Sequence, residues 1–478
     1  MRRRTSQYIA VLAVAGIAFT SCNKTVDLDP SHTINGDNFF KTVDEYDFAL
    51  TGAYRNIRAS NSLYAGVNGG SVWLSAVDIA ADNFTGGPNN LGNLNTAFRW
   101  NYTADGAVPR NAWNAAYLGI QSANLAMRGI DRFAATEPLK VNRIEGQART
   151  LRAHLHFELF RWWASEYDRN STALAVPYVK VFDIEQKPSR PTVKEFYDEM
   201  EADLKTAREM LSNTDRPIQS LTSTAGTERA YVDRLVADAL LARMYLYANL
   251  PDSAIKYATF VINARPLASA AEFPLVWQDA STAGVIWSIK YQAGNAALAR
   301  EIYQPAGDQI SWTPVNELLN LYGGSDIRTD AYWRVRNGRV VLGKYFAKST
   351  ASGSPDGVVD FKAYRTAEMY LIRAEAYAKK DMDAEGLADL NSLRSARNAS
   401  TGFESGDELE AAIQIERRKE LLVEGHRFFD LKRTIRTVTR TQGCASWCTL
   451  PPANRGWSFP IPQTEILANS NMEQNPGY

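Results

Sequence analysis

Two stretches of the chain share one pattern of apolar and polar positions. In residues 365–400, apolar residues recur at steps of three and four, the spacing of one helix face, on both sides of a polar break at 379–381. The apolar positions are Ala367, Tyr370, Leu371, Ala374, Tyr377 and Ala378 before the break, and Leu387, Leu390, Leu393 and Ala396 after it. This pattern predicts an antiparallel helix pair whose alanines let the two backbones approach closely.

The same pattern occurs in residues 231–264. A single shift without a gap places Ala242 on Ala374 and Tyr245 on Tyr377. A helix pair that recurs with a tyrosine in its first helix is typical of tetratricopeptide-like repeats, whose period is about 34 residues. One such pair cannot bury both of its faces, so we expect stacked neighbours. Two unrelated amphipathic hairpins would show the same periodicity, and this alternative remains open at this point.

The rest of the chain alternates between segments with helical periodicity and segments without a regular pattern. Helical periodicity predicts helices near 44–57, 113–130, 141–163, 192–211 and 407–424, with Thr192 as an N-cap, and alternation with β-branched residues predicts strands at 285–292 and 338–346. Two long excursions, about 60–107 and 265–360, lack a sustained period, and long irregular segments in a helical protein are usually functional or mobile. The expected fold is mainly α, a tetratricopeptide-like scaffold of helical pairs with long irregular excursions and a few short strands.

The N-terminus has the organisation of an export signal. Arg2, Arg3 and Arg4 precede an apolar run at 8–19, which as a helix would rise about 18 Å, too short for a hydrocarbon core of about 30 Å. We therefore predict a lipoprotein signal peptide at 1–21, a lipid anchor on Cys22, and a single domain at 22–478. Ordinary cleavage that leaves Cys22 as a free thiol is the alternative.

The net charge and the cysteines limit the kinds of partner, metal and cofactor to be expected. Removing 1–21 takes away three arginines and no acid from a chain with equal numbers of acidic and basic residues, so there is no basis for a nucleic-acid partner. Cys444 and Cys448 lie close together in a chain predicted to be exported, and we predict a disulfide between them. A metal site is disfavoured because two thiols without a nearby histidine supply half a ligand set. We expect no metal and no cofactor.

Residues 415–433, IERRKELLVEGHRFFDLKR, resemble the signature of the SusD/RagB family, the outer-membrane nutrient-binding lipoproteins of Bacteroidetes. Four further segments agree in the order of the chain: NFF at 38–40 with ALTGAY at 49–54, ADN at 81–83, Trp113 with Tyr117, Ile120, Ala123 and Asn124, and FPIP at 459–462 with NPGY at 475–478. The resemblance implies one helical domain that binds oligosaccharide at the cell surface, over a TonB-dependent transporter of the SusC type.

The 415–433 motif also has a reading in physical terms. Gly425 permits a tight turn, Phe428 and Phe429 are expected to fill the core, and the charged residues are expected to pair across neighbouring helices. Those charged residues are Glu416, Arg417, Arg427 and Asp430. We therefore predict a folding role for this motif and do not assign Glu424, His426 and Asp430 as a catalytic set.

No enzymatic motif stands out in a suitable context. His154 and His156 are two apart on a predicted helix and point to different faces, which excludes the i, i+4 geometry of a metalloprotease. We predict a non-enzyme. A glycosidase would need two carboxyl groups about 5–10 Å apart in a cleft.

A sugar ligand would need flat apolar rings against its C–H face and polar groups for its hydroxyls. Candidate ligand-binding residues in the excursions are Tyr64, Trp73, Phe84, Trp100, Tyr303 and Trp312, with Asp82, Asn83 and Asn90 as polar partners. Tyr303 and Trp312 flank a turn at 305–307 and are the rings expected on the surface, whereas Trp73 lies in an apolar run more typical of a core. Other tryptophans are assigned to the core: Trp113, Trp162, Trp163 and Trp287.

Four functions remain open from the sequence. The first is a surface lipoprotein of the outer membrane that captures glycan for a SusC-type transporter. The second keeps this architecture with a peptide cargo, as in the RagB branch. The third is a tetratricopeptide scaffold that binds only protein. The fourth is a glycosidase, which turnover of an oligosaccharide by the purified protein would establish.

Overall fold

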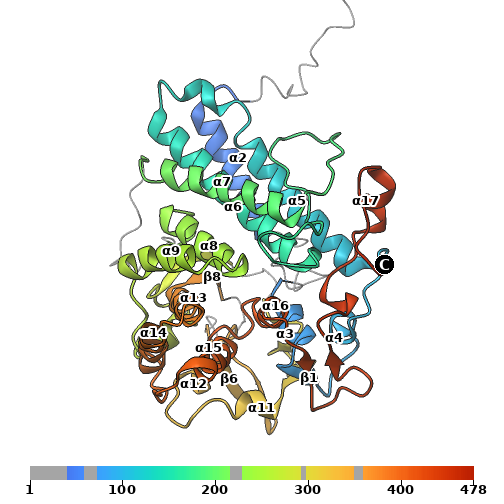
Figure 1. Ribbon diagram of the computed structural model, residues 1–478, viewed down its shortest axis with the longest axis vertical. Helices are drawn as coiled ribbons and strands as arrows, with labels where there is room; N and C mark the ends of the chain where they lie inside the picture. Colours follow the sequence, from blue (N-terminus) through green and yellow to red (C-terminus); the bar gives the residue numbers. More distant parts are fainter. Residues whose placement is uncertain (1–39, 59–72, 216–228, 292–297, 349–358) are drawn as a thin grey trace, which may run out of the picture. The chain divides into compact units, whose positions relative to one another are not determined.

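The computed structural model describes residues 40–58, 73–215, 229–291, 298–348 and 359–478 (Figure 1). The predicted signal peptide at 1–21, the anchor Cys22 and the candidate Tyr64 lie outside these residues. The chain divides into two units, Met1–Glu45 and Tyr46–Tyr478, and the helix packing and the cavities lie within the second. No helix in the described ranges combines the length and the hydropathy of a membrane span.

Helices dominate the described residues. Each predicted helix is present, with ends that differ by a few residues from the periodicity. The α-helices are α2 (Val43–Arg58), α3 (Ser75–Ala80), α4 (Asn95–Arg99), α5 (Ala107–Leu125), α6 (Pro138–Trp163), α7 (Val193–Met210), α8 (Arg234–Tyr247), α9 (Pro251–Ala264), α10 (Phe273–Val276), α11 (Asn316–Leu319), α12 (Arg328–Tyr332), α13 (Thr366–Ala378), α14 (Asp383–Ser395), α15 (Gly406–Glu420), α16 (Arg427–Arg433) and α17 (Gln463–Ala468), and short 3₁₀ turns occur at Ile130–Phe133 and Arg455–Trp457.

The two sequence-related hairpins are neighbours in space. α8 packs on α9, α9 packs on α13, and α13 packs on both α14 and α15, so the second helix of one pair lies against the first helix of the next (Figure 1). α5, α6, α7 and α8 extend the series of packed neighbours. This is the packing expected of stacked helical repeats, in which each pair buries the face that its neighbour leaves open.

Alanine and leucine form the seam around α13, as the periodicity predicts. Ala367, Leu371 and Ala374 are buried in one cluster with Leu390 and Leu393 of α14. At Gly386 an added Cβ would lie 3.1 Å from the carbonyl oxygen of Ala374, which shows how closely the two backbones approach.

Local signals at helix ends are also confirmed. Thr192 is the N-cap of α7: its hydroxyl accepts from the Glu195 N–H at 3.2 Å, and the Glu195 carboxylate accepts from the Thr192 N–H at 2.8 Å. This reciprocal pair is a capping box.

The strands form small antiparallel pairs. β2 (Val285–Ile289) pairs with β8 (Phe361–Arg365), and β6 (Trp333–Arg336) pairs with β7 (Arg339–Leu342), which confirms the two predicted strands with shorter ends. The other pairs are β1 (Phe84–Gly86) with β5 (Trp312–Pro314), β3 (Tyr303–Gln304) with β4 (Gln309–Ile310), and β9 (Val438–Thr439) with β10 (Thr449–Leu450). The expected excursions therefore contain ordered short elements.

The family-like motif has the folding role predicted for it. Gly425 has a φ of +81°, and a Cβ there would lie 2.4 Å from the Trp73 carbonyl oxygen, so a side chain would be both strained and obstructed. Phe428 and Phe429 are fully buried, and both rings contact Trp162.

The motif's charged residues form ion pairs, only one of which lies within the predicted set. Arg417 pairs with Asp430 at 3.0 Å. The other two charged residues of the set pair with residues outside the motif: Arg427 binds Asp82 at 2.7 Å, and Glu416 binds Arg328 at 2.5 Å. The motif thus connects α15 and α16 to two distant segments, because its long side chains span the gaps between elements.

Glu424 and His426 are buried with the motif. Glu424 pairs with Lys344 at 2.5 Å and with Arg365 at 2.7 Å, and burial lowers the pKa of His426 well below its ordinary value, so that its ring stays neutral. Cys444 and Cys448 form a disulfide, as the sequence predicts.

Candidate functional site

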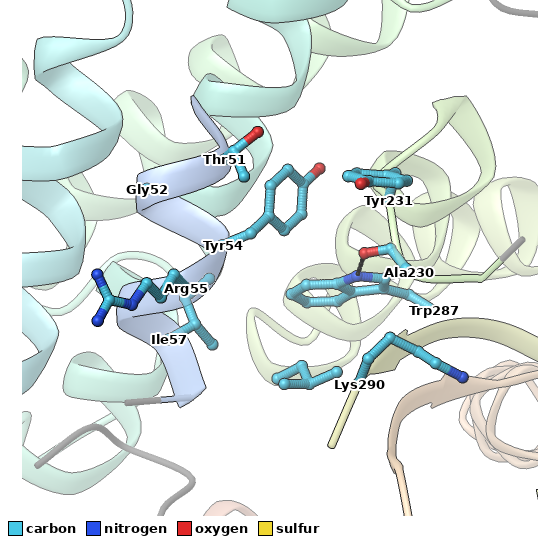
Figure 2. Close-up of a pocket in the computed structure, with 10 residues that line it drawn as sticks. Thr51, Gly52, Tyr54, Arg55, Ile57, Ala230, Tyr231, Trp287 and Lys290 are labelled. Carbon is cyan, nitrogen blue, oxygen red and sulfur yellow. Dashed lines mark hydrogen bonds between the residues drawn. The ribbon is translucent and has the colours of Figure 1, made fainter. Parts of the chain in front are cut away.

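A cavity of about 290 Å³ lies between helix α2 and strand β2 (Figure 2). One wall is the face of α2, where residues three and four apart lie together. The opposite wall is the end of β2 and the turn before α8. The lining residues are Thr51, Gly52, Tyr54, Arg55, Ile57, Ala230, Tyr231, Trp287, Ile289 and Lys290.

Trp287 is held rigidly at the floor of this pocket. Its indole N–H donates to the Ala230 carbonyl at 3.1 Å, and its ring stacks on Tyr364 with centroids 6.2 Å apart. His154 meets the indole edge-on at 5.2 Å, and its Nδ1 lies 3.0 Å from the Tyr364 hydroxyl. Burial lowers the pKa of His154 well below its ordinary value, so this support is uncharged.

Tyr54 offers a ring rather than a free hydroxyl. Its OH donates to Gln147 Oε1 at 3.0 Å and accepts from the Val232 N–H at 2.9 Å. Burial raises the pKa of Tyr54, so the phenol remains protonated. Because both hydrogen bonds lock the ring in place, Tyr54 contributes an apolar surface of fixed orientation.

Tyr231 completes the aromatic set and is its most accessible member. Its ring meets Tyr54 edge-on, with centroids 5.3 Å apart and an interplanar angle of 87°. Tyr231 is 40% exposed, whereas Trp287 is 1% exposed. A ligand that enters the pocket can therefore cover the open face of Tyr231 without unpacking the core.

The two cationic side chains at the rim do not make the pocket positively charged. Lys290 pairs with Asp360. Figure 2 shows the Lys290 amine and the Arg55 guanidinium directed away from the three aromatic rings. Among the described residues that line the pocket there is no carboxylic acid. The interior is thus aromatic, aliphatic and close to neutral, which suits the C–H face of an uncharged ring more than an ion.

The structure places the rings predicted from the sequence in the interior. Trp73, Phe84, Tyr303 and Trp312 are each 1% exposed, and Trp100 is 7% exposed. The core assignment of Trp113, Trp162, Trp163 and Trp287 is confirmed. The expectation that Tyr303 and Trp312 lie on the surface is wrong.

Neighbouring elements explain this burial. β5 pairs with β1, the Trp312 indole N–H donates to the Asn93 carbonyl at 3.1 Å, and the indole ring lies 5.2 Å from the Phe98 ring between centroids. The Tyr303 hydroxyl donates to Asp308 at 2.8 Å, and its ring meets Phe346 at 5.4 Å. A turn nearby in sequence does not by itself expose a ring.

The predicted polar partners are occupied by the fold. The Asp82 carboxylate accepts a hydrogen bond from Arg427. The Asn83 amide donates to Asp78 at 2.7 Å and accepts from Arg418 at 2.7 Å. Asn90 accepts from the Gly92 N–H at 2.8 Å within its own loop. None of these described residues lines the aromatic pocket.

Sequence reasoning therefore missed the three rings of the pocket. The sequence places Tyr54 in the ALTGAY segment and Tyr231 at the start of a predicted helical hairpin, and the core position of Trp287, although confirmed, does not indicate that the ring also lines a pocket. No sequence spacing connects three residues that come from three separate segments. The only local signal was that ALTGAY places Gly52 beside Tyr54 on one helix.

Comparisons with known proteins agree over most of the chain. Residues 287–478 match a family described as "SusD family", and residues 54–246 match one described as "Starch-binding associating with outer membrane". SusD-like protein P2 of Formosa agariphila is 24% identical over 99% of this chain and 100% of that protein. The starch-binding protein SusD of Bacteroides thetaiotaomicron is 35% identical over 25% of this chain and 22% of its own length. Among solved structures, a SusD superfamily protein from Bacteroides thetaiotaomicron superposes with a TM-score of 0.77 at 24% identity, covering 91% of this chain and 100% of that one, which shows the shared fold.

Proposed function

The chain belongs to the SusD/RagB family, and from this premise we propose that it is a glycan-binding protein of the bacterial outer membrane. The observation that carries the proposal is the aromatic pocket of Tyr54, Tyr231 and Trp287. Its support comes from the relative named as a starch-binding protein and from the matched family described as starch-binding.

The pocket favours an uncharged saccharide. A sugar has C–H groups on its faces and hydroxyls around its rim, and aromatic rings cover such faces well. A ring contact that buries about 100 Å² gains about 2–3 kcal/mol at about 25 cal/mol per Å², before the entropy of association is subtracted. With one open ring, one that forms a wall and one at the floor, we expect micromolar or weaker affinity.

The role proposed for this binding is capture of nutrient for a transporter of the SusC type, without catalysis. A lipid anchor on Cys22 would hold the protein at the outer membrane, and that residue lies outside the described part of the chain. A glycosidase would need two carboxyl groups in the cleft, and the described lining of this pocket supplies none.

Gly52 offers a sharp test of the pocket. A Cβ added there meets nothing within 4 Å, so the helix tolerates a side chain that fills the cavity. Gly52→Phe is expected to abolish glycan binding by occlusion, while the matched control Gly52→Ala keeps it and is no less stable, because alanine favours a helix over glycine. Tyr231→Ala is expected to weaken binding about tenfold or more, since it removes the exposed ring.

The measurement is isothermal titration of the purified mature protein. The probes are a neutral α-glucan oligosaccharide, a uronate-containing oligosaccharide and a sulfated oligosaccharide from a wider glycan panel. Binding of neutral sugar that Gly52→Phe leaves unchanged would refute this site, and preference for the anionic sugars would refute its proposed selectivity.

A further inference from the structure

A second cavity, of about 350 Å³, lies in a different part of the described chain and shares no residue with the aromatic pocket. Helix α5 forms one wall, the loop between α6 and α7 forms another, and the C-terminal segment closes the third side. The lining residues are Trp113, Asn114, Tyr117, Leu118, Gln121, Pro177, Val179, Asp183, Ile184, Gln186, Pro188, Glu465 and Met472.

The walls of this cavity are fixed by hydrogen bonds from three elements. From α5, the Asn124 amide donates to the carbonyls of Val179 and Val181, each at 3.2 Å. From α6, His156 Nε2 accepts from the Val179 N–H at 2.9 Å. From the C-terminal segment, Asn469 donates to the Pro188 carbonyl at 2.9 Å. The loop is therefore preorganised, and a ligand would not have to order it on binding.

The rim of the cavity is aliphatic. Leu118 is 60% exposed and Ile184 is 85% exposed, whereas the Trp113 ring below them is 3% exposed. The Tyr117 hydroxyl already donates to the Pro177 carbonyl at 2.9 Å. The most exposed side chains at this rim are thus branched and aliphatic, which suits an aliphatic side chain of a ligand.

The charged groups that line this cavity are anions. Asp183 and Glu465 bring carboxylates, and no lysine or arginine is among the described lining residues. A ligand that carries positive charge would therefore meet two carboxylates and no competing cation among the described lining residues.

We propose that this cavity is a docking site for a polypeptide segment of a partner protein, one that presents a lysine or arginine beside an aliphatic side chain. The aliphatic side chain would cover Leu118 and Ile184. The cation would meet the Asp183 and Glu465 carboxylates. Charge complementarity sets the class of the occupant, because an anionic segment would face two like charges.

The test uses the full mature protein and a pair of blocked peptides, acetyl-Leu-Lys-Leu-Arg-Leu-amide and acetyl-Leu-Glu-Leu-Glu-Leu-amide, in isothermal titration at physiological salt. The basic peptide is expected to bind saturably with a sub-millimolar dissociation constant, and the acidic peptide about tenfold or more weaker. Asp183→Asn combined with Glu465→Gln is expected to weaken the basic peptide about fivefold or more, and Ile184→Ser is expected to weaken it because it removes the aliphatic contact without adding charge.

The matched control removes two exposed carboxylates elsewhere, by Asp407→Asn with Glu408→Gln on α15, and is expected to leave the affinity unchanged. Glycan binding at the Tyr231 pocket should be the same in every variant, which shows that each one is folded. Four outcomes would overturn the proposal: no saturable binding of the basic peptide, equal binding of the acidic one, equal loss in the control, or binding of the neutral oligosaccharide at this cavity instead.

Discussion

Replacing Glu420 by glutamine tests the ion network behind the family motif. The Glu420 side chain is fully buried, and its carboxylate accepts from Arg365 at 2.7 Å, from Arg397 at 2.9 Å and from Arg328 at 3.1 Å. Glutamine keeps the size and shape of the side chain. It removes the negative charge and turns an NH₂ donor toward guanidinium donors, so at least one of these hydrogen bonds is replaced by a clash of donors.

The expected loss of stability follows from the hydrogen-bond acceptors that each arginine keeps after the substitution. Arg365 retains Glu424 at 2.7 Å, and Arg328 retains Asp326 at 2.8 Å. Arg397 is left with carbonyl acceptors, those of Ala268 and Ala396, both at 3.1 Å, since Glu420 is its one carboxylate partner in the described residues. One uncompensated buried guanidinium costs about 3–5 kcal/mol, and we expect Glu420→Gln to lower the free energy of unfolding by about this amount.

The loss should depend on pH. Burial by itself raises the pKa of Glu420, but Arg397, Arg365 and Arg328 outweigh it and hold this pKa far below its usual range. A depressed folded-state pKa contributes stability above the unfolded-state pKa of about 4.3, and this contribution is lost as pH falls toward the folded-state value. The stability difference between wild type and Glu420→Gln should therefore be full near pH 7 and shrink below about pH 4.

Urea unfolding followed by circular dichroism at several pH values measures this difference. The control is Glu404→Gln, which also removes an arginine partner, Arg394 at 2.9 Å, but from a carboxylate that is 25% exposed. Such a pair is worth about 0.2–1 kcal/mol. If Glu420→Gln costs no more than Glu404→Gln, or if its cost is the same at all pH values, the network does not stabilise the fold as described.

Three further changes have defined outcomes. Tyr303→Ala with Trp312→Ala should lower the melting temperature strongly, since loss of a buried aromatic side chain costs about 3–5 kcal/mol, and an unchanged melting temperature would contradict their burial. Gly425→Ala should cost about 1–3 kcal/mol for its positive φ and more for the contact with the Trp73 carbonyl, measured by urea unfolding, and wild-type stability would contradict the turn. Cys22→Ala should release the protein from the membrane in a cell fractionation, and continued membrane retention would count against the anchor.

The sequence was sufficient for features whose cause is local. Helix periodicity predicted the pairs around Ala242 and Ala374, and a single polar position, Thr192, predicted a cap. The 415–433 motif predicted both the turn at Gly425 and the burial of Phe428. In each case the residues that carry the signal lie within one or two helical turns of one another, so the pattern and the structure it causes occupy the same segment.

The tertiary structure alone decided which rings face a ligand. Trp312 looked accessible beside a turn, yet pairing of β5 with β1 turns its indole onto Phe98. Tyr54, Tyr231 and Trp287 come from three segments and form a pocket only because the fold brings α2, the turn before α8 and the end of β2 around one cavity. The exposure of a side chain is set by whichever distant element packs over it, and that contact leaves no periodic trace along the chain.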